Sequence, residues 1–408
     1  MSEWKQVKLE DFVELITDYV ANGSFASLKA NVQIYKEPNY ALMVKTADFA
    51  NDFTKSLTYT DRRGYDYLSK SKLFGGELLL SNIGSVGKVF RVPYFDRPTT
   101  LASNSIMIRC KEELYYKWLY YFFLSPIGNQ MLNGITTGTT MKKFNKTGLR
   151  GLIISVPGDD EKKRIVTRIE ELFSELDNGV ETLRKTKQQL AVYRQAVIST
   201  AFPEMTDSNT VRLDEIAEIT GGITKGRDLS KQETVHLPYL RVANVQNGYL
   251  DLSQMKTIEL KVSEIEKYLL CAGDVLYTEG GDRDKLGRGT IWNNEIPNCV
   301  HQNHVFKARL DQTKANPRYV SYWSMSAFAR NYFYNKGKQS VNLASINKTV
   351  LSALTLPLPS LTEQEAALRE IESRLSVCDE IEKTVDTALQ QAAAMRQSIL
   401  KQAFEGKL

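Results

Sequence analysis

The chain has 408 residues and a net charge of +5; 42% of its residues are hydrophobic and 25% are charged, a composition typical of a folded protein with two or three domains. No apolar run approaches the roughly eighteen residues of a membrane span, and the first residues form no apolar leader, so we expect neither a membrane protein nor a secreted one. Four scattered cysteines without CxxC spacing exclude a disulfide scaffold and favour a cytoplasmic location.

The positive charge is concentrated in two blocks. Residues 1–157 carry a net +6 and residues 206–360 a net +3, whereas 158–205 and 361–408 carry −1 and −3. Basic blocks of this kind favour a polyanionic partner such as nucleic acid.

An internal repeat with an offset of 202 residues is the strongest pattern in the chain. Segment 145–202 matches segment 347–404 without a gap, including Arg194-Gln195 with Arg396-Gln397. Looser matches upstream join 7–15 to 211–219, 44–48 to 240–244, and 73–81 to 270–278. We infer two copies of one unit, alike at the C-terminal end and divergent in the middle.

Each copy begins with a variable part, at 1–157 and 206–360. Short apolar runs between Gly-rich turns, as in GGELLLSNIGSVGKVFRV, predict strands. The aromatic stretches 115–125 and 318–333 predict buried helices. Both variable parts are therefore predicted to be α/β domains.

Each copy ends in a conserved segment, at 158–205 and 361–408, that predicts one long helix. No proline interrupts 161–202 or 363–404, which gives helices on the order of 60 Å long. Asp160 is the expected cap of the first helix, and Thr362 with Glu365 forms the expected capping box of the second.

Apolar residues on both helices recur every 3.5 residues, which predicts a coiled-coil seam. The alternative is that each helix lies on its own domain, but forty residues exceed what a small domain can cover, so we favour pairing. The predicted helix-pairing residues are Ile169, Leu172, Leu176, Leu183, Leu190, Tyr193, Ile371, Ile381, Val385, Ala392, Met395 and Ile399.

No set of residues in the chain predicts catalysis or a bound cofactor. An amino-methyltransferase would need an Asn/Asp-Pro-Pro-aromatic loop, and a phosphate-binding loop would need G-x-x-x-x-G-K-[ST]; neither is present. Cys299, His301 and His304 have a spacing suggestive of zinc, but no second ligand pair accompanies them, so we expect no metal.

Basic and small polar residues in the two variable parts are instead candidates for contacts with DNA. Lys and Arg supply phosphate contacts, while Asn, Gln and Arg can read base edges. The candidates in the first part are Arg62, Arg63, Asn82, Ser85, Lys88, Thr139, Lys142 and Lys143. Those in the second part are Lys225, Arg227, Arg241, Asn244, Arg283, Lys285, Arg288, Lys338, Gln339 and Asn342.

Both conserved segments resemble those of type I restriction-modification specificity subunits. The resemblance rests on SVPGDDEKKRIVTRIEELFSELD…YRQAVISTAFP at 155–203 and on LPLPSLTEQEAALREIESRL…MRQSILKQAFEGKL at 356–408. It covers the whole chain, although Asp159-Asp160-Glu161-Lys162 replaces the usual Leu-x-Glu-Gln in the first copy.

The resemblance implies two α/β target recognition domains joined by two long antiparallel helices with a pseudo-twofold repeat. Each domain would read one half of a bipartite DNA site, and the helices would set the spacer and dock two modification subunits. These subunits would hold S-adenosylmethionine, and restriction subunits would join them.

Two other classes of function stay open. One is an enzyme whose motif is too degenerate to recognise, which activity of the purified chain with cofactor or magnesium would establish. The other is a structural adaptor whose basic domains bind protein, which indifference to duplex DNA at any salt concentration would support.

Overall fold

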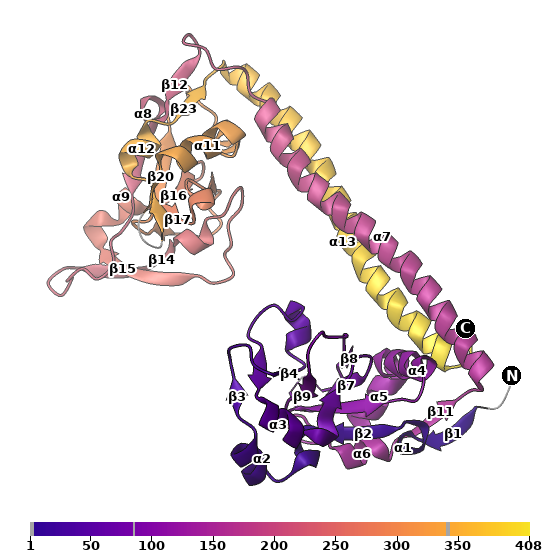
Figure 1. Ribbon diagram of the computed structural model, residues 1–408. Helices are drawn as coiled ribbons and strands as arrows, with labels where there is room; N and C mark the ends of the chain where they lie inside the picture. The colour runs from indigo at the N-terminus through magenta and orange to yellow at the C-terminus, as the bar shows by residue number, and fades with distance from the viewer. Residues whose placement is uncertain (1–3, 85, 340–342) are drawn as a thin grey trace. The chain divides into compact units, whose positions relative to one another are not determined.

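The computed structural model describes residues 4–84, 86–339 and 343–408. The contacts divide the chain into two compact units, one of residues 1–182 with 387–408 and one of residues 183–386. Each unit contains one globular domain and a portion of each long helix (Figure 1). The helices thus contribute to both compact units.

The first domain is built on the antiparallel sheet β2-β10-β7-β8. Its strands are β2 (Leu15–Asp18), β7 (Leu78–Ser81), β8 (Val89–Arg91) and β10 (Ser105–Arg109). Leu78 and Leu80 pack in one core with Trp118, whereas Leu79, which points to the opposite face, packs in another. Burial on both faces explains why this strand is a continuous apolar run.

A second sheet, β3-β5-β4-β9-β6, covers the Leu79 face. Its strands are β3 (Ile34–Tyr35), β4 (Ala41–Val44), β5 (Thr58–Thr60), β6 (Lys72–Leu73) and β9 (Thr99–Leu101). The helices of this domain are α1 (Leu9–Phe12), α2 (Phe25–Asn31), α3 (Arg62–Tyr67), α4 (Glu113–Leu124), α5 (Pro126–Gly134) and α6 (Lys146–Arg150). A separate pair, β1 (Lys5–Lys8) with β11 (Ile153–Val156), joins the two ends of the domain.

The second domain repeats this plan with the sheet β13-β20-β16-β18. Its strands are β13 (Ala217–Gly221), β16 (Val275–Thr278), β18 (Gly289–Ile291) and β20 (Val305–Leu310). Smaller sheets comprise β14 (Thr234–Leu240), β15 (Lys256–Lys261) and β19 (Val300–His301), then β17 (Gly280–Gly281), β21 (Lys338–Gln339) and β22 (Ala344–Ser345). The ends meet through β12 (Thr210–Arg212) and β23 (Thr355–Pro357). The helices are α8 (Leu213–Ile216), α9 (Ile265–Tyr268), α10 (Pro317–Ser324), α11 (Ala327–Lys336) and α12 (Lys348–Ser352).

The repeat extends into the parts that diverge in sequence. Both predicted aromatic helices are present, as α4 and as α10 followed by α11. The helix that follows is capped alike in each domain, because the Ser125 hydroxyl accepts from the Gly128 amide and the Ser326 hydroxyl from the Ala329 amide. The same local chemistry is thus retained where the apolar residues have changed.

The two long helices are α7 (Asp159–Thr200) and α13 (Leu361–Phe404). Both predicted caps are wrong, because each helix begins earlier than expected and Asp160 and Thr362 lie inside the first turn. The capping box is Ser360 with Glu363: the Ser360 amide donates to the Glu363 carboxylate at 2.9 Å, and the Glu363 amide donates to the Ser360 hydroxyl at 3.4 Å.

At the C-terminal end of each long helix, a phenylalanine packs against aromatic residues of a domain core. In the first unit, Phe404 of α13 lies with its ring centroid 4.7 Å from that of Trp118 and 5.5 Å from that of Phe122. In the second unit, Phe202 lies 5.1 Å from both Tyr319 and Trp323. Phe202 and Phe404 are 202 residues apart, so the repeat preserves this contact.

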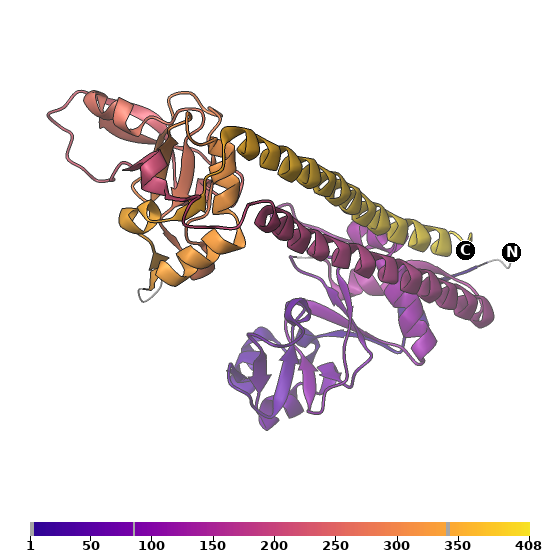
Figure 2. The ribbon, with the colours of Figure 1, turned by 90° about the horizontal axis from the view of Figure 1, so that it is seen from above.

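Within each unit, the portions of α7 and α13 run side by side in opposite directions (Figure 1, Figure 2). In the first unit Arg396 forms an ion pair with Asp177. In the second, Arg194 pairs with Asp379, and Lys187 with Asp386 at 2.8 Å. The Arg194–Asp379 and Arg396–Asp177 pairs are related by the repeat, as expected for a pseudo-twofold axis. The predicted fold class, two α/β domains joined by long antiparallel helices, is confirmed.

Most predicted helix-pairing residues are at least partly buried, but Tyr193, Ile381 and Met395 are exposed by 49%, 40% and 55% and do not lie in the seam. The neighbouring Arg194, Glu382 and Arg396 are partly buried in their place. Their ion pairs satisfy these charges inside the seam. A pattern based on apolar residues alone therefore selects Tyr193, Ile381 and Met395 in place of the charged residues that follow them in the chain.

The apolar helices of this chain are short. Among the described residues, no helix combines the length and the hydropathy that crossing a bilayer requires.

Candidate nucleic-acid interface

Two of the predicted segments of the first domain lie together. The turn after β7 and the loop 137–143 are joined because the Gly84 amide donates to the Lys142 carbonyl at 3.2 Å and the Phe144 amide to the Asn82 carbonyl at 3.1 Å. Thr137 and Lys143 exchange backbone hydrogen bonds of 2.8 and 2.9 Å, which close the loop. We call these segments, residues 82–84 and 86–88 together with 137–143, the first loop pair.

The first loop pair carries a dense set of exposed cations. Lys88, Lys142 and Lys143 are exposed, as is Thr139. The Asn82 side-chain amide is partly buried and donates to the Phe144 carbonyl at 3.2 Å, so it secures the loop pair from within. Ser85 lies outside the described residues. Three exposed lysines therefore lie on two segments that backbone hydrogen bonds join.

Arg62 and Arg63 lie apart from the first loop pair, on α3. Arg62 is 3.9 Å from Asp66 and lies over the ring of Tyr40, and Arg63 donates to the Asn31 side chain at 3.3 Å. Both are exposed, but their partners belong to the α2–α3 region.

The second domain has an equivalent loop pair. Here β17, directly after β16, pairs with β22, and β22 pairs with β21. Lys338 and Gln339 form β21, and Arg283 and Lys285 form the 3₁₀ turn that follows β17. Arg283 lies over the ring of Tyr334, and Lys285 forms an ion pair with Asp282. We call residues 279–288, 338–339 and 343–345 the second loop pair; Asn342 lies outside the described residues.

The other candidates of the second domain differ in how accessible they are. Lys225 is exposed and lies 4.9 Å from the ring centre of Tyr239, whereas Arg227 forms an ion pair with Glu264 at 2.9 Å. Arg241 donates to the Gln254 carbonyl at 2.5 Å. Asn244 is only 2% exposed, and its amide donates to the Asp251 carbonyl at 2.8 Å. Burial makes Asn244 a support for this loop.

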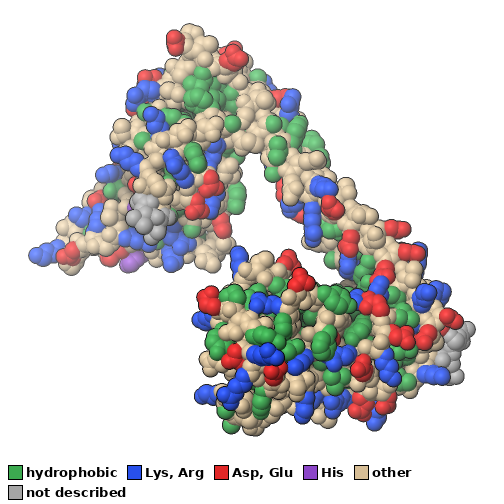
Figure 3. All heavy atoms as spheres, in the orientation of Figure 1, with side chains coloured by type: hydrophobic (Ala, Val, Ile, Leu, Met, Phe, Trp, Pro, Cys, Tyr) green, Lys and Arg blue, Asp and Glu red, His purple; other side chains and the backbone are tan. Residues whose placement is uncertain are grey.

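Acidic side chains are interspersed among the Lys and Arg side chains on the visible faces of both domains (Figure 3). On these visible faces, positive charge is therefore mixed with negative charge. The cations of the loop pairs suit a ligand whose own charges are closely spaced, such as a phosphate backbone.

Gln246, which was not among the predicted DNA contacts, accepts a hydrogen bond from Arg288 at 3.1 Å. Gln246 lies two residues after the match of 44–48 with 240–244. An extension of that match by two residues would have drawn attention to it.

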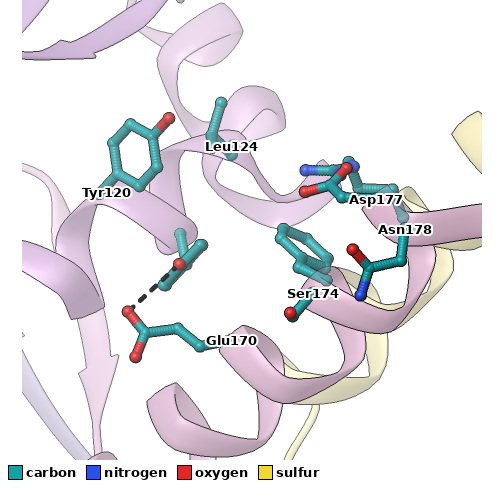
Figure 4. A pocket seen from close by; sticks show the side chains of 9 residues that line it. Tyr120, Leu124, Glu170, Ser174, Asp177 and Asn178 are labelled. Carbon is teal, nitrogen blue, oxygen red and sulfur yellow. Dashed lines mark hydrogen bonds and ion pairs between the residues drawn. The ribbon is translucent and has the colours of Figure 1, made fainter. Parts of the chain in front are cut away.

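A pocket of about 520 Å³ in the first unit lies between α4, α7 and the end of α13 (Figure 4). Its Glu170 carboxylate is 2.8 Å from the Lys117 ammonium, and the Tyr121 hydroxyl donates to Glu170 at 3.5 Å. Burial, then the Glu170 charge, raises the pKa of Tyr121 to about 12. Asp177 is paired with Arg396. These groups hold the helices on the domain.

His301 and His304 contact oxygen atoms of the protein, a backbone carbonyl and a carboxylate. Among the residues that the structure describes, no group of three His, Cys, Asp or Glu side chains could hold a metal ion. His304 Nδ1 lies 2.7 Å from the Glu279 carboxylate. His301 is fully buried, with Nδ1 2.7 Å from the Val305 carbonyl, so Nδ1 carries the proton and Nε2 has no partner.

The buried His301 predicts a pH-dependent stability. Burial lowers its pKa to about 4, so the unfolded chain takes up the proton first as the pH falls. The free energy of unfolding should be unaffected by His301 above pH 7 and should decrease by about 3 kcal/mol between pH 6.5 and 4. Urea unfolding of the wild type and of His301→Phe across this range tests it; parallel pH profiles would contradict it.

The comparisons with known proteins identify the family. Residues 1–190 and 205–391 match the family described as type I restriction modification DNA specificity domain. The chain belongs to the family of type I restriction-modification specificity subunits. Its loop pairs therefore lie in two DNA recognition domains.

Alignments with known specificity subunits extend over most of the chain. The chain is 24% identical to the type I restriction enzyme EcoKI specificity subunit of Escherichia coli K12 over 317 residues. The aligned region covers 74% of this chain and 68% of the relative. The chain is 26% identical over 306 residues to the type I restriction enzyme StySPI specificity subunit of Salmonella potsdam, an alignment that covers 71% of this chain and 65% of the relative. A chain from a solved type I restriction-modification system has the same fold, with a TM-score of 0.70, 15% identity, and coverage of 100% and 99%.

Proposed function

We propose that each domain of this specificity subunit reads one half of a bipartite, asymmetric duplex DNA site. The observation that carries the proposal is the loop pair, which recurs at equivalent places in two domains whose side chains there differ. Equivalent supports with different side chains suit two half-sites of different sequence. The chain supplies recognition and no catalysis of its own.

The paired helices set the spacer between the half-sites and dock two modification subunits. The ion pairs Arg194–Asp379 and Arg396–Asp177 support this, because a pseudo-twofold pair of helices offers two like copies of one surface. The modification subunits hold S-adenosylmethionine for adenine methylation, restriction subunits join them, and the complex acts in the cytoplasm.

The test is co-purification with the modification subunit, followed by mapping of methylated adenines across the genome. We expect a bipartite motif with a fixed gap, and replacement of residues 1–157 by those of another specificity subunit should change one half only. No methylation and no stable partner would contradict the proposal and favour a structural adaptor.

The lysines of the first loop pair should contact phosphates. Lys142→Ala with Lys143→Ala should weaken binding to all duplexes alike and reduce the slope of log K against log salt by about 2, because each lost phosphate contact removes about 0.9. Fluorescence anisotropy across a salt series measures both quantities. The double variant Lys29→Ala with Lys36→Ala, which removes two exposed lysines elsewhere in the domain, should leave the slope nearly unchanged. An altered base preference would show that Lys142 or Lys143 reads bases.

A further inference from the structure

Lys88 and Arg288 occupy equivalent positions in the two recognition domains. Lys88 directly precedes β8, and its carbonyl accepts from the amide of Ser81, the last residue of β7, at 2.9 Å. Arg288 directly precedes β18, and its carbonyl accepts from the amide of Thr278, the last residue of β16, at 2.8 Å. An equivalent hydrogen bond thus places the two cations at equivalent points of the main sheets of the two domains.

A second pair of equivalent positions faces these cations. The buried Asp48 accepts from the Lys45 amide at 2.8 Å, and the buried Asn244 accepts from the Arg241 amide at 3.0 Å. The Asp48 and Asn244 amides in turn donate to the Lys45 and Arg241 carbonyls at 3.0 and 2.9 Å, so the four-residue turns 45–48 and 241–244 are closed alike. Two residues further along, the first domain has Ala50 and the second has Gln246.

The two domains use this place differently. In the first, Ala50 and Lys88 line an open pocket of about 490 Å³, together with the stacked rings of Phe49 and Phe90. In the second, Gln246 and Arg288 meet, with the Gln246 side-chain oxygen accepting from Arg288 Nη1 at 3.1 Å. The side chains therefore differ at a place where the backbone is alike, which is what two readers of different half-sites require.

Gln246 is held so that its oxygen must face Arg288. Its side-chain Nε2 donates to the Ala243 carbonyl at 2.9 Å, which fixes the orientation of the amide. The Gly248 amide donates to the Gly289 carbonyl at 2.9 Å, which ties this turn to the start of β18 beside Arg288. Within the described ranges, Arg288 makes no other side-chain hydrogen bond and no ion pair, and it is partly exposed. A neutral group anchors one edge of the guanidinium. The Asp282 carboxylate interacts with Arg288 electrostatically without forming an ion pair with it, and the remaining donors of the guanidinium are left for a ligand.

We propose that Arg288, positioned by Gln246, reads a guanine in the half-site bound by the second domain. A planar guanidinium held in one orientation can donate two parallel hydrogen bonds to O6 and N7 of guanine in the major groove. An oriented guanidinium can also bind phosphate in a bidentate manner. We favour base reading because the anchored guanidinium lies where the backbones of the two domains are alike and their side chains differ. This inference rests on the proposed function and adds which residue selects which base.

The test is selection of bound duplexes from a randomised library by the full chain co-purified with its modification subunits. The wild type should select a bipartite motif with a guanine in the half read by the second domain. Arg288→Ala should reduce the preference for that guanine on the order of ten- to a hundredfold. Gln246→Ala should weaken the same preference, because the guanidinium then loses its anchor. Arg288→Lys should retain part of it.

Controls separate this inference from the proposed function. Lys285→Ala, in the same loop pair, should weaken binding to all duplexes and leave the motif unchanged. Retained selection at the other positions of the half-site read by the second domain shows that this domain is folded in each variant. If the wild type selects a motif and Arg288→Ala weakens all sequences equally, Arg288 is a phosphate contact and the inference is wrong; an unaltered motif and affinity would also overturn it. If the wild type selects no bipartite motif, the proposed function itself fails.

Discussion

Phe404→Ala is expected to lower the free energy of unfolding of the first unit by about 3–5 kcal/mol. Phe404 is 6% exposed and contacts the rings of Trp118 and Phe122, so its removal leaves a cavity in the main core of the first domain. Phe404 also holds the end of α13 on that domain, so loss of its ring should loosen the helix end as well. The effect is large because a residue near one end of the chain completes a core formed near the other.

Thermal and urea unfolding of the full chain measure this change. Met395→Ala, at an exposed position of the same helix, is the control and should change stability by less than about 0.5 kcal/mol. Phe202→Ala should destabilise the second unit by a smaller amount, because Phe202 is only partly buried. Equal stability of Phe404→Ala and the wild type would contradict the docking of α13.

Removal of one heptad from each long helix is expected to change the DNA spacer. Seven residues shorten a helix by about 10.5 Å, or roughly three base pairs of duplex. The deletions are placed between Asp177 and Lys187 in α7 and between Asp386 and Arg396 in α13. Both flanking ion pairs, Asp177–Arg396 and Lys187–Asp386, then keep their partners. A seven-residue step also retains the apolar seam.

Methylome mapping with the doubly shortened subunit measures the spacer. We expect either a shorter spacer or no methylation, since the half-sites also rotate about the DNA axis when they approach. A deletion in α7 alone should disrupt helix pairing, which makes it the matched control. The same spacer in the wild type and the doubly shortened chain would show that the helices do not set the distance.

The sequence predicted the two long helices and the fold class, because a 58-residue match at constant offset requires two like structures. It also located both loop pairs, since Gly and Lys concentrate in these turns. It failed at Tyr193, Ile381 and Met395, because side-chain type alone does not reveal that an ion pair satisfies Arg194, Glu382 and Arg396 inside the seam. Asn244 was chosen as a polar residue near a basic one, and its burial depends on the fold of the loop.

Local periodicity and the repeat are enough to predict the architecture of this specificity subunit, since they depend only on residues close along the chain or at a fixed offset. Which polar side chains face outward depends instead on contacts between residues far apart in the sequence. The contact of Gln246 with Arg288 joins residues 42 positions apart, and the docking of Phe404 on Trp118 joins residues 286 positions apart. Such contacts follow from the path of the backbone in three dimensions, and neither spacing nor composition records that path.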